Sequence, residues 1–240
     1  MKAFLITIAI LTIGFIMANC RNTEYSNLDM EYNSHMTQSS FWLNRYLFAC
    51  EYEDGNIISL SDSTMLLDSA MWYANKANSL KSSAVAPYLR RLGVLYLKQE
   101  YDSVLYHCNN DSLSKRTFSS LTYEEYPLVL NNRTKARIKE KLGDTASRNQ
   151  FISRNVVILE KYVSGTSVED LMLKVSNEYD IFKHGETVAI IEYFYYLSIT
   201  NYELAISKIA EFERKYPDQP ILLLKIKETI KQPLFWAPML

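Results

Sequence analysis

The chain has 240 residues, of which 48% are hydrophobic and 13% aromatic, a composition typical of a folded globular protein and not of a disordered one. Its 26 Lys and Arg residues nearly balance its 27 Asp and Glu residues, so a net charge of −1 provides no global field that would attract nucleic acid. Six Gly and six Pro residues are too few for the turns of an all-β sandwich, so the composition favours helices.

The N-terminal segment is apolar and uncharged between Lys2 and Cys20. It is typical of a secretory signal and resembles the bacterial lipoprotein type, in which residues 1–19 are removed and Cys20 becomes the lipidated first residue. The resemblance implies a protein of a Gram-negative, Bacteroidota-type envelope, anchored by lipid in the outer membrane and facing the periplasm. Cleavage without lipid and a retained anchor helix, which would barely reach across a bilayer, are the alternatives.

Residues 20–38 are polar and lack helical periodicity, which predicts a flexible tether, and folding is expected to begin near Ser39. From there apolar residues recur at intervals of three and four, the spacing of a helix. The first predicted stripe comprises Phe41, Trp42, Tyr46, Leu47 and Cys50. A second helix follows the predicted caps Ser61 and Asp62, and its apolar face comprises Met65, Leu66, Ala70, Tyr73, Ala74 and Ala77.

Further helical segments follow in pairs along the chain. The predicted segments are 83–98 with 101–108, 151–162 with 168–179, and 187–199 with 202–216, and a polar helix is expected over 133–141. The folded domain is therefore placed at residues 39–231. Residues 232–240 form an apolar tail, which either folds back on the last hairpin or offers a hydrophobic peptide to a partner.

The small residues of the second helices recur at a common interval. Ala70 and Val104 lie 34 residues apart, and Ala205 follows Val104 by 101 residues, one short of three such intervals. By this spacing residues 117–186 should hold two more units, although they carry almost none of the pattern. Stacked helical hairpins need such a repeat, because each buries its apolar face on the one before it.

On these residues the chain resembles a tetratricopeptide repeat protein. The positions that match the family's packing pattern are Leu92, Gly93, Tyr96, Tyr101 and Val104 in one unit, Tyr202, Ala205, Phe212 and Pro217 in another, and Ala70, Ala74 and Ala77 in a third. The resemblance implies an all-α fold of stacked antiparallel hairpins. It also implies a module that binds a protein or peptide in a groove lined by first helices.

The chemistry-bearing residues show no catalytic arrangement in the sequence. There is no phosphate-binding loop, metalloprotease motif, nucleophile elbow or Cys-x-x-Cys pair, and His35, His107 and His184 lack ligand spacing. We therefore expect no enzyme activity, no cofactor and no metal. Cys50 and Cys108 are either a disulfide or two small buried residues, and the second alternative is slightly favoured.

Two further patterns concern surfaces. Arg133, Arg137 and Lys141 share one helical face, which is interpreted as solvated in preference to a site for an acidic partner or lipid headgroups. The aromatic run 193–196 covers all sides of its helix, and core packing is preferred over a role at an interface.

The functional prediction is a non-enzymatic envelope lipoprotein that acts as a protein-binding module or scaffold. Within the same class, an immunity-type lipoprotein that neutralises a toxin in the periplasm is the alternative. A glycan-binding protein or an enzyme with dispersed residues is the competing class. A pocket with exposed aromatic platforms or convergent carboxylates would favour that competing class.

Overall fold

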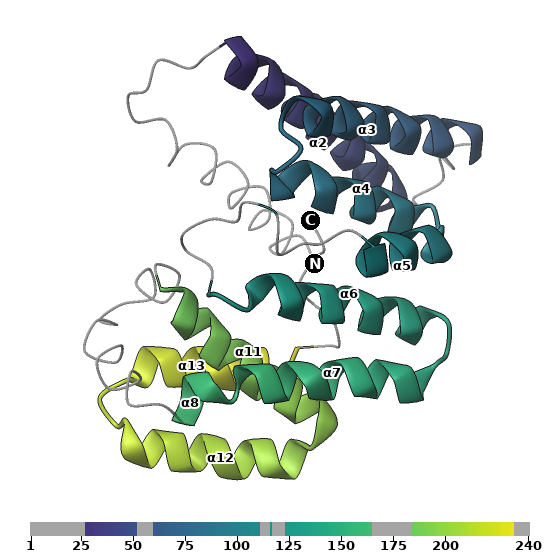
Figure 1. Ribbon diagram of the computed structural model, residues 1–240. Coiled ribbons are helices and arrows are strands. Elements are labelled where there is room, and N and C mark those ends of the chain that lie inside the picture. Colours follow the sequence, from purple (N-terminus) through teal and green to yellow (C-terminus); the bar gives the residue numbers. More distant parts are fainter. Residues whose placement is uncertain (1–26, 52–59, 111–115, 117–122, 165–183, 233–240) are drawn as a thin grey trace.

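The structure is a computed structural model that describes residues 27–51, 60–110, 116, 123–164 and 184–232. Every regular element in these ranges is a helix, which confirms the all-α prediction (Figure 1). The elements are α2 (Asn27–Glu51), α3 (Leu60–Leu80), α4 (Val85–Leu97), α5 (Tyr101–Asn110), α6 (Tyr126–Lys141), α7 (Thr145–Leu159), α8 (Lys161–Ser164), α11 (Gly185–Thr200), α12 (Tyr202–Lys215) and α13 (Pro220–Thr229).

Helices that follow one another in the chain lie side by side. Contacts run from α2 to α3 and onward through α4, α5, α6 and α7, and α7 packs against α11. Both α12 and α13 then pack on α11. Figure 1 shows the resulting stack, with α2 and α3 at one end and α12 at the other. Short connections link α4 to α5, α6 to α7 and α11 to α12, and a helix that ends in such a turn must return along its neighbour.

The first helix begins earlier than predicted. Residues 27–38, assigned to the flexible tether, belong to α2, so the predicted start at Ser39 is wrong. This part of α2 is held on α3: Asp29 forms an ion pair with Lys81, and the Lys81 ammonium lies 4.7 Å from the centre of the Tyr32 ring. These contacts link residues far apart in sequence, so helical periodicity could not reveal them. Residues 1–26, including Cys20, lie outside the described residues.

In the middle of the stack, α4 and α5 form a hairpin around a common core. Tyr88 and Leu92 of α4 are buried together with Val104 and Cys108 of α5, and Ile138 of α6 completes this cluster. The turn between the helices places Gln99 at a φ of 62°, a left-handed conformation that residues with a side chain seldom adopt. Gln99 therefore holds a sparsely populated backbone conformation, which only the surrounding packing can maintain.

The α6–α7 hairpin is held by a buried amide pair. Asn132 donates to the side-chain oxygen of Asn155 at 3.0 Å, and Asn155 donates to the backbone oxygen of Val129 at 3.1 Å. At the start of α7, the Asp144 side chain accepts a hydrogen bond from the Ser147 amide and caps the helix. Burial of a polar pair that is mutually satisfied fixes the register of the two helices.

Helix α11 is the centre of the second half of the molecule. It contacts α7, α8, α12 and α13, so no face is left for solvent over most of its length. Tyr193, Phe194, Tyr195 and Tyr196 are each at most 5% exposed, which agrees with the preferred interpretation of core packing. Helix α11 therefore contributes a large share of the apolar area buried in the core, since aromatic side chains bury the largest areas.

The spacing of the hairpins is not constant. Among the described helices, the second members of the pairs α2–α3, α4–α5 and α6–α7 begin at residues 60, 101 and 145, at intervals of 41 and 44 residues. Within 117–186 the described residues hold one hairpin, α6–α7, and the short α8, while residues 165–183 lie outside the description. The fixed 34-residue interval inferred from Ala70, Val104 and Ala205 is thus not followed by the hairpins themselves.

Candidate functional site

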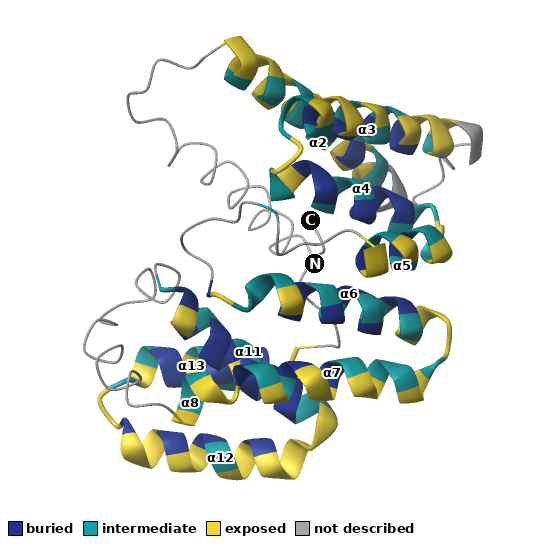
Figure 2. Ribbon diagram, in the orientation of Figure 1, coloured by how far each residue is buried: buried dark blue, intermediate teal, exposed yellow. Residues whose placement is uncertain are grey.

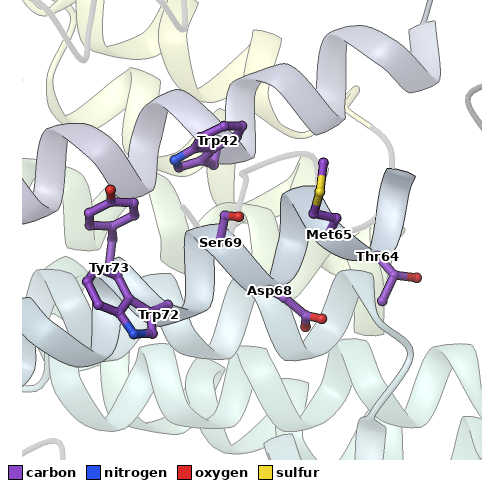
Figure 3. A pocket seen from close by; sticks show the side chains of 7 residues that line it. All are labelled: Trp42, Thr64, Met65, Asp68, Ser69, Trp72 and Tyr73. Carbon is purple, nitrogen blue, oxygen red and sulfur yellow. The ribbon is translucent and has the colours of Figure 1, made fainter. Parts of the chain in front are cut away.

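An open groove runs along the surface between α2 and α3. Its volume is about 900 Å³. It is lined by Trp42 of α2 and by Thr64, Met65, Asp68, Ser69, Trp72 and Tyr73 of α3 (Figure 3). We call it the α2–α3 groove.

The lining follows from the helical period of α3. Residues four apart in a helix lie one above another, so Met65, Ser69 and Tyr73 form one row and Thr64, Asp68 and Trp72 form the next. In Figure 3 the first row lies on the side of α3 nearer to Trp42, and the second row turns away from α2. The two helices are held in register by Ser39, whose hydroxyl donates to the backbone oxygen of Ala70 at 2.7 Å.

The groove exposes large apolar side chains. Met65 is 56% exposed and Trp72 is 52% exposed, while Phe41 on the adjoining face of α2 is 50% exposed. The sequence placed Phe41 and Met65 in apolar helical stripes, and the structure shows that both are exposed members of these stripes. Helix α3 packs between α2 and α4, and Met65 and Phe41 lie on parts of their helices that these neighbours do not cover.

Polar groups border the groove. The Asp68 carboxylate accepts from Lys98 of α4 at 2.9 Å, and the Lys76 ammonium lies 5.4 Å from the centre of the Trp72 ring. At the other end, the Arg45 guanidinium lies 5.8 Å from the Trp42 ring. Within the described part of the chain the buried Nε1–H of Trp42 has no acceptor. An indole N–H that is buried without a partner costs free energy.

Two of the three histidines lie beside aromatic rings, and the third lies at the start of a helix. The ring of His35, placed by the sequence in the tether, meets Trp72 edge to face with centroids 6.3 Å apart and lies 5.9 Å from Tyr73. His107 lies beside Tyr88, and His184 is the N-cap residue of α11. No group of His, Cys, Asp and Glu side chains among the residues described is arranged to hold a metal ion.

A second polar cluster lies inside the molecule, between α6 and α11. Arg133 forms an ion pair with Glu192 at 3.1 Å, with side-chain exposures of 11% and 15%. The Tyr123 hydroxyl donates to the other oxygen of Glu192. Burial, and then the charge of Glu192, raise the pKa of Tyr123 well above its ordinary range. This cluster is closed and satisfied, so its chemistry is that of a structural ion pair.

The predicted basic face is therefore not a solvated surface. Arg133 is buried against Glu192, and the Arg137 guanidinium lies 4.9 Å from the centre of the Tyr96 ring on α4. Lys141 alone of the three is exposed. The interpretation failed because residue spacing shows which side chains share a face but not what that face meets.

The residues matched to the repeat pattern lie in different environments. Ala70, Ala74, Ala77, Val104 and Ala205 are fully buried, Leu92 and Phe212 are nearly so, and Gly93 is buried. The rings of Tyr96 and Tyr101 lie 5.7 Å apart and are partly buried. Tyr202 is 52% exposed and Pro217 is exposed, so these two do not pack between helices as their places in the pattern imply.

The cysteine predictions are resolved in part. Cys108 is buried in the α4–α5 core. Its environment matches the alternative of a small buried residue. The side chain of Cys50 and the apolar tail from residue 233 onward lie outside the described residues.

Comparison of the chain with protein-family models, with curated proteins and with solved structures finds no match. Among the described helices, none is both long enough and apolar enough to cross a membrane.

Sequence reasoning missed the α2–α3 groove. Trp42, Met65 and Tyr73 were identified only as core stripe members, and Trp72 was not identified at all. A usable signal was present: α3 carries Met65, Trp72 and Tyr73 in addition to the small residues of its packing stripe, which is more apolar surface than one packing face requires. The large apolar residues that neighbouring helices leave exposed mark a candidate surface.

Proposed function

We propose that the chain is a non-enzymatic interaction module of the bacterial envelope, built of helical repeats, that binds another protein through the α2–α3 groove. The observation that carries the proposal is the exposure of Met65 and Trp72 in an open groove. Exposed apolar clusters of this kind occur where a partner covers them, because water contact costs free energy. Trp in particular supplies much of the binding free energy at protein interfaces.

The geometry of the groove supports a helical or extended protein segment as ligand. Met65 and Trp72 are seven residues apart on α3, and two helical turns place them about 10 Å apart along the axis. A helix that lies in the groove would meet both with residues seven apart in its own sequence. The proposed repeat architecture agrees with the observed stacking, in which each hairpin packs on the next.

The proposed location of the protein in the cell envelope rests on its N-terminal residues. The apolar run that ends at Cys20 supports a lipid anchor in the outer membrane, with the domain in the periplasm. A scaffold and an immunity-type protein would use the same groove. They differ in the partner, which is several envelope proteins for the scaffold and a single toxin for the immunity protein.

Site-specific photo-cross-linking in the native bacterium tests this proposal. A photoreactive phenylalanine analogue replaces Met65 or Trp72 in the full chain, and matched controls replace Leu224 on α13 or Val157 on α7, which are 58% and 72% exposed. We expect defined protein adducts from positions 65 and 72 alone. Adducts that are the same at all positions, or absent at all of them, contradict the proposal.

Glycan binding is the second candidate, because one observation favours it. The exposed Trp72 indole lies in one row with the Thr64 hydroxyl and the Asp68 carboxylate, a combination that could stack on a sugar ring and bond its hydroxyls. However, Lys76 and Tyr73 already contact the indole, and Met65 and Trp42 offer no hydrogen-bond acceptors for sugar hydroxyls. Quenching of Trp fluorescence by oligosaccharides, lost in Trp72→Ala, would support glycan binding.

A further inference from the structure

Both ends of the stack expose large apolar side chains, which at the C-terminal end are Tyr202, Leu204 and Ile206 of α12 and Leu224 of α13. At the C-terminal end, α13 packs on α11 and Lys227 of α13 pairs with Glu213 of α12 at 2.7 Å. At the N-terminal end, the outer sides of α2 and α3 are largely exposed (Figure 2). The large apolar side chains exposed there are Leu28, Met30, Phe41, Phe48, Met65 and Trp72. The terminal unit of a helical repeat array needs a polar outer face to stay soluble. The apolar outer face of α2 and α3 therefore indicates a surface that a partner covers.

The exposed row of α3 carries an acid, an aromatic ring and a base at equal spacing. Asp68, Trp72 and Lys76 are four residues apart, which places them on one face about 6 Å apart along the axis. All three are exposed, with Asp68 at 58% and Trp72 at 52%. Trp72 therefore lies midway between two opposite charges.

The order of Asp68, Trp72 and Lys76 along α3 is complementary to the same three residues on a second, antiparallel copy of the helix. If a second α3 lies antiparallel to the first with the two Trp72 residues facing, Asp68 of each chain falls opposite Lys76 of the other. A two-fold axis requires this reciprocity, in which one residue contacts a second and the second contacts the first. An antiparallel pair of α3 helices thus buries both indoles and forms two ion pairs.

We propose that the partner of this surface is a second copy of the chain, joined by a two-fold contact centred on Trp72 of α3. The inference rests on the proposed function, since it names the protein that covers the exposed side of the groove. The existing contact of Asp68 is compatible with it. Lys98 binds Oδ1 of Asp68 and also pairs with Glu100 at 3.1 Å, and the Asp68 carboxylate remains more than half exposed.

The charge pattern allows a test by complementation. In the Asp68→Lys chain the row has two basic side chains, and in the Lys76→Asp chain it has two acidic ones. Each variant should repel its own copies, whereas the two variants mixed should attract each other at both contacts. Exposed ion pairs are individually weak, so reversal of two of them should weaken self-association about tenfold.

The experiment uses full chains with two different affinity tags, reconstituted in lipid nanodiscs of fixed composition, with capture of one tag measured by the other. Wild type should capture wild type, each single variant should capture itself about tenfold less, and the mixed pair should recover the wild-type level. Glu203→Lys on α12 is the matched charge reversal outside the surface and should capture as wild type does. Circular dichroism establishes that each variant is folded.

Equal capture by every combination, or no capture by any, overturns the inference, because neither result depends on the α3 charges. The cross-linking test separates this failure from that of the proposed function. An adduct at position 72 with twice the mass of the chain supports self-association. An adduct with a different protein, together with no recovery in the mixed pair, overturns the second copy as partner and leaves the groove as a binding site.

Discussion

At the scale of single residues, the decisive feature is the environment of charged side chains that look alike in the sequence. Arg133 lies in the core, paired with Glu192, whereas Lys141 on the same helix faces solvent. Burial alone lowers the pKa of Arg133, but the surrounding tyrosines and Glu192 outweigh it and raise that pKa above its ordinary value. The guanidinium therefore stays charged, and the stability of the folded state depends on its ion pair with Glu192.

Glu192→Gln should lower the free energy of unfolding by about 3 kcal/mol, because it leaves Arg133 charged, buried and without its counter-ion. Urea unfolding followed by circular dichroism measures this change. The control is Glu140→Gln, which removes a surface partner of Arg148 at 2.6 Å and should cost less than about 1 kcal/mol. If the two variants lose the same stability, the inner pair is no more important than a surface one.

At the scale of elements, the sequence predicted most helices in the described residues but not their surroundings. Apolar spacing located α3, α4, α5, α11 and α12 within a few residues, because a helix on a packed core repeats its buried face every turn. It missed the first part of α2, in which Asp29 and Tyr32 contact Lys81 just after α3 and neither belongs to an apolar stripe. Polar contacts between distant residues leave no periodic signal.

The same limit explains the groove. Met65 and Ala70 lie on one helix and both fit an apolar pattern, yet Met65 is 56% exposed and Ala70 is fully buried. Spacing gives the angle between side chains on a helix, whereas burial depends on which neighbours exist. The local pattern does not show which other helices lie beside each part of α3.

Packing between α11 and α12 depends on the small side chain of Ala205. Ala205 is fully buried in the cluster that also includes Ile209 and Phe212, while Ala210 on the same helix is exposed. Ala205→Leu should lower the melting temperature by several degrees, since overpacking costs about 1–3 kcal/mol. Ala210→Leu has the same effect on helix propensity and should leave the melting temperature nearly unchanged. Equal effects of both changes would show that α12 does not pack closely at Ala205.

At the scale of the whole molecule, the core is divided along the stack. One cluster joins α2, α3 and α4, and a second joins α4, α5 and Ile138 of α6. A third and larger cluster fills the space from α6 to α13. The first two are linked to the third through α6, where Asn131 also donates to the backbone oxygen of Cys108 at 2.9 Å. The linear order of such clusters follows from chain order, whereas their sizes depend on long-range contacts and could not be predicted.

This division predicts that the two halves of the stack open separately. Ile138→Ala removes a fully buried side chain from the α4–α5 cluster, and Ile152→Ala removes an equally buried one from the large cluster. Such truncations cost about 2–5 kcal/mol where the side chain is packed. Native-state hydrogen exchange should then show lower opening free energies in α4 and α5 for the first variant and in α11 for the second. In an array where each unit contacts only its neighbours, the unaltered half keeps its protection to within about 0.5 kcal/mol. Equal loss of protection in all helices for both variants would instead identify the chain as one cooperative unit.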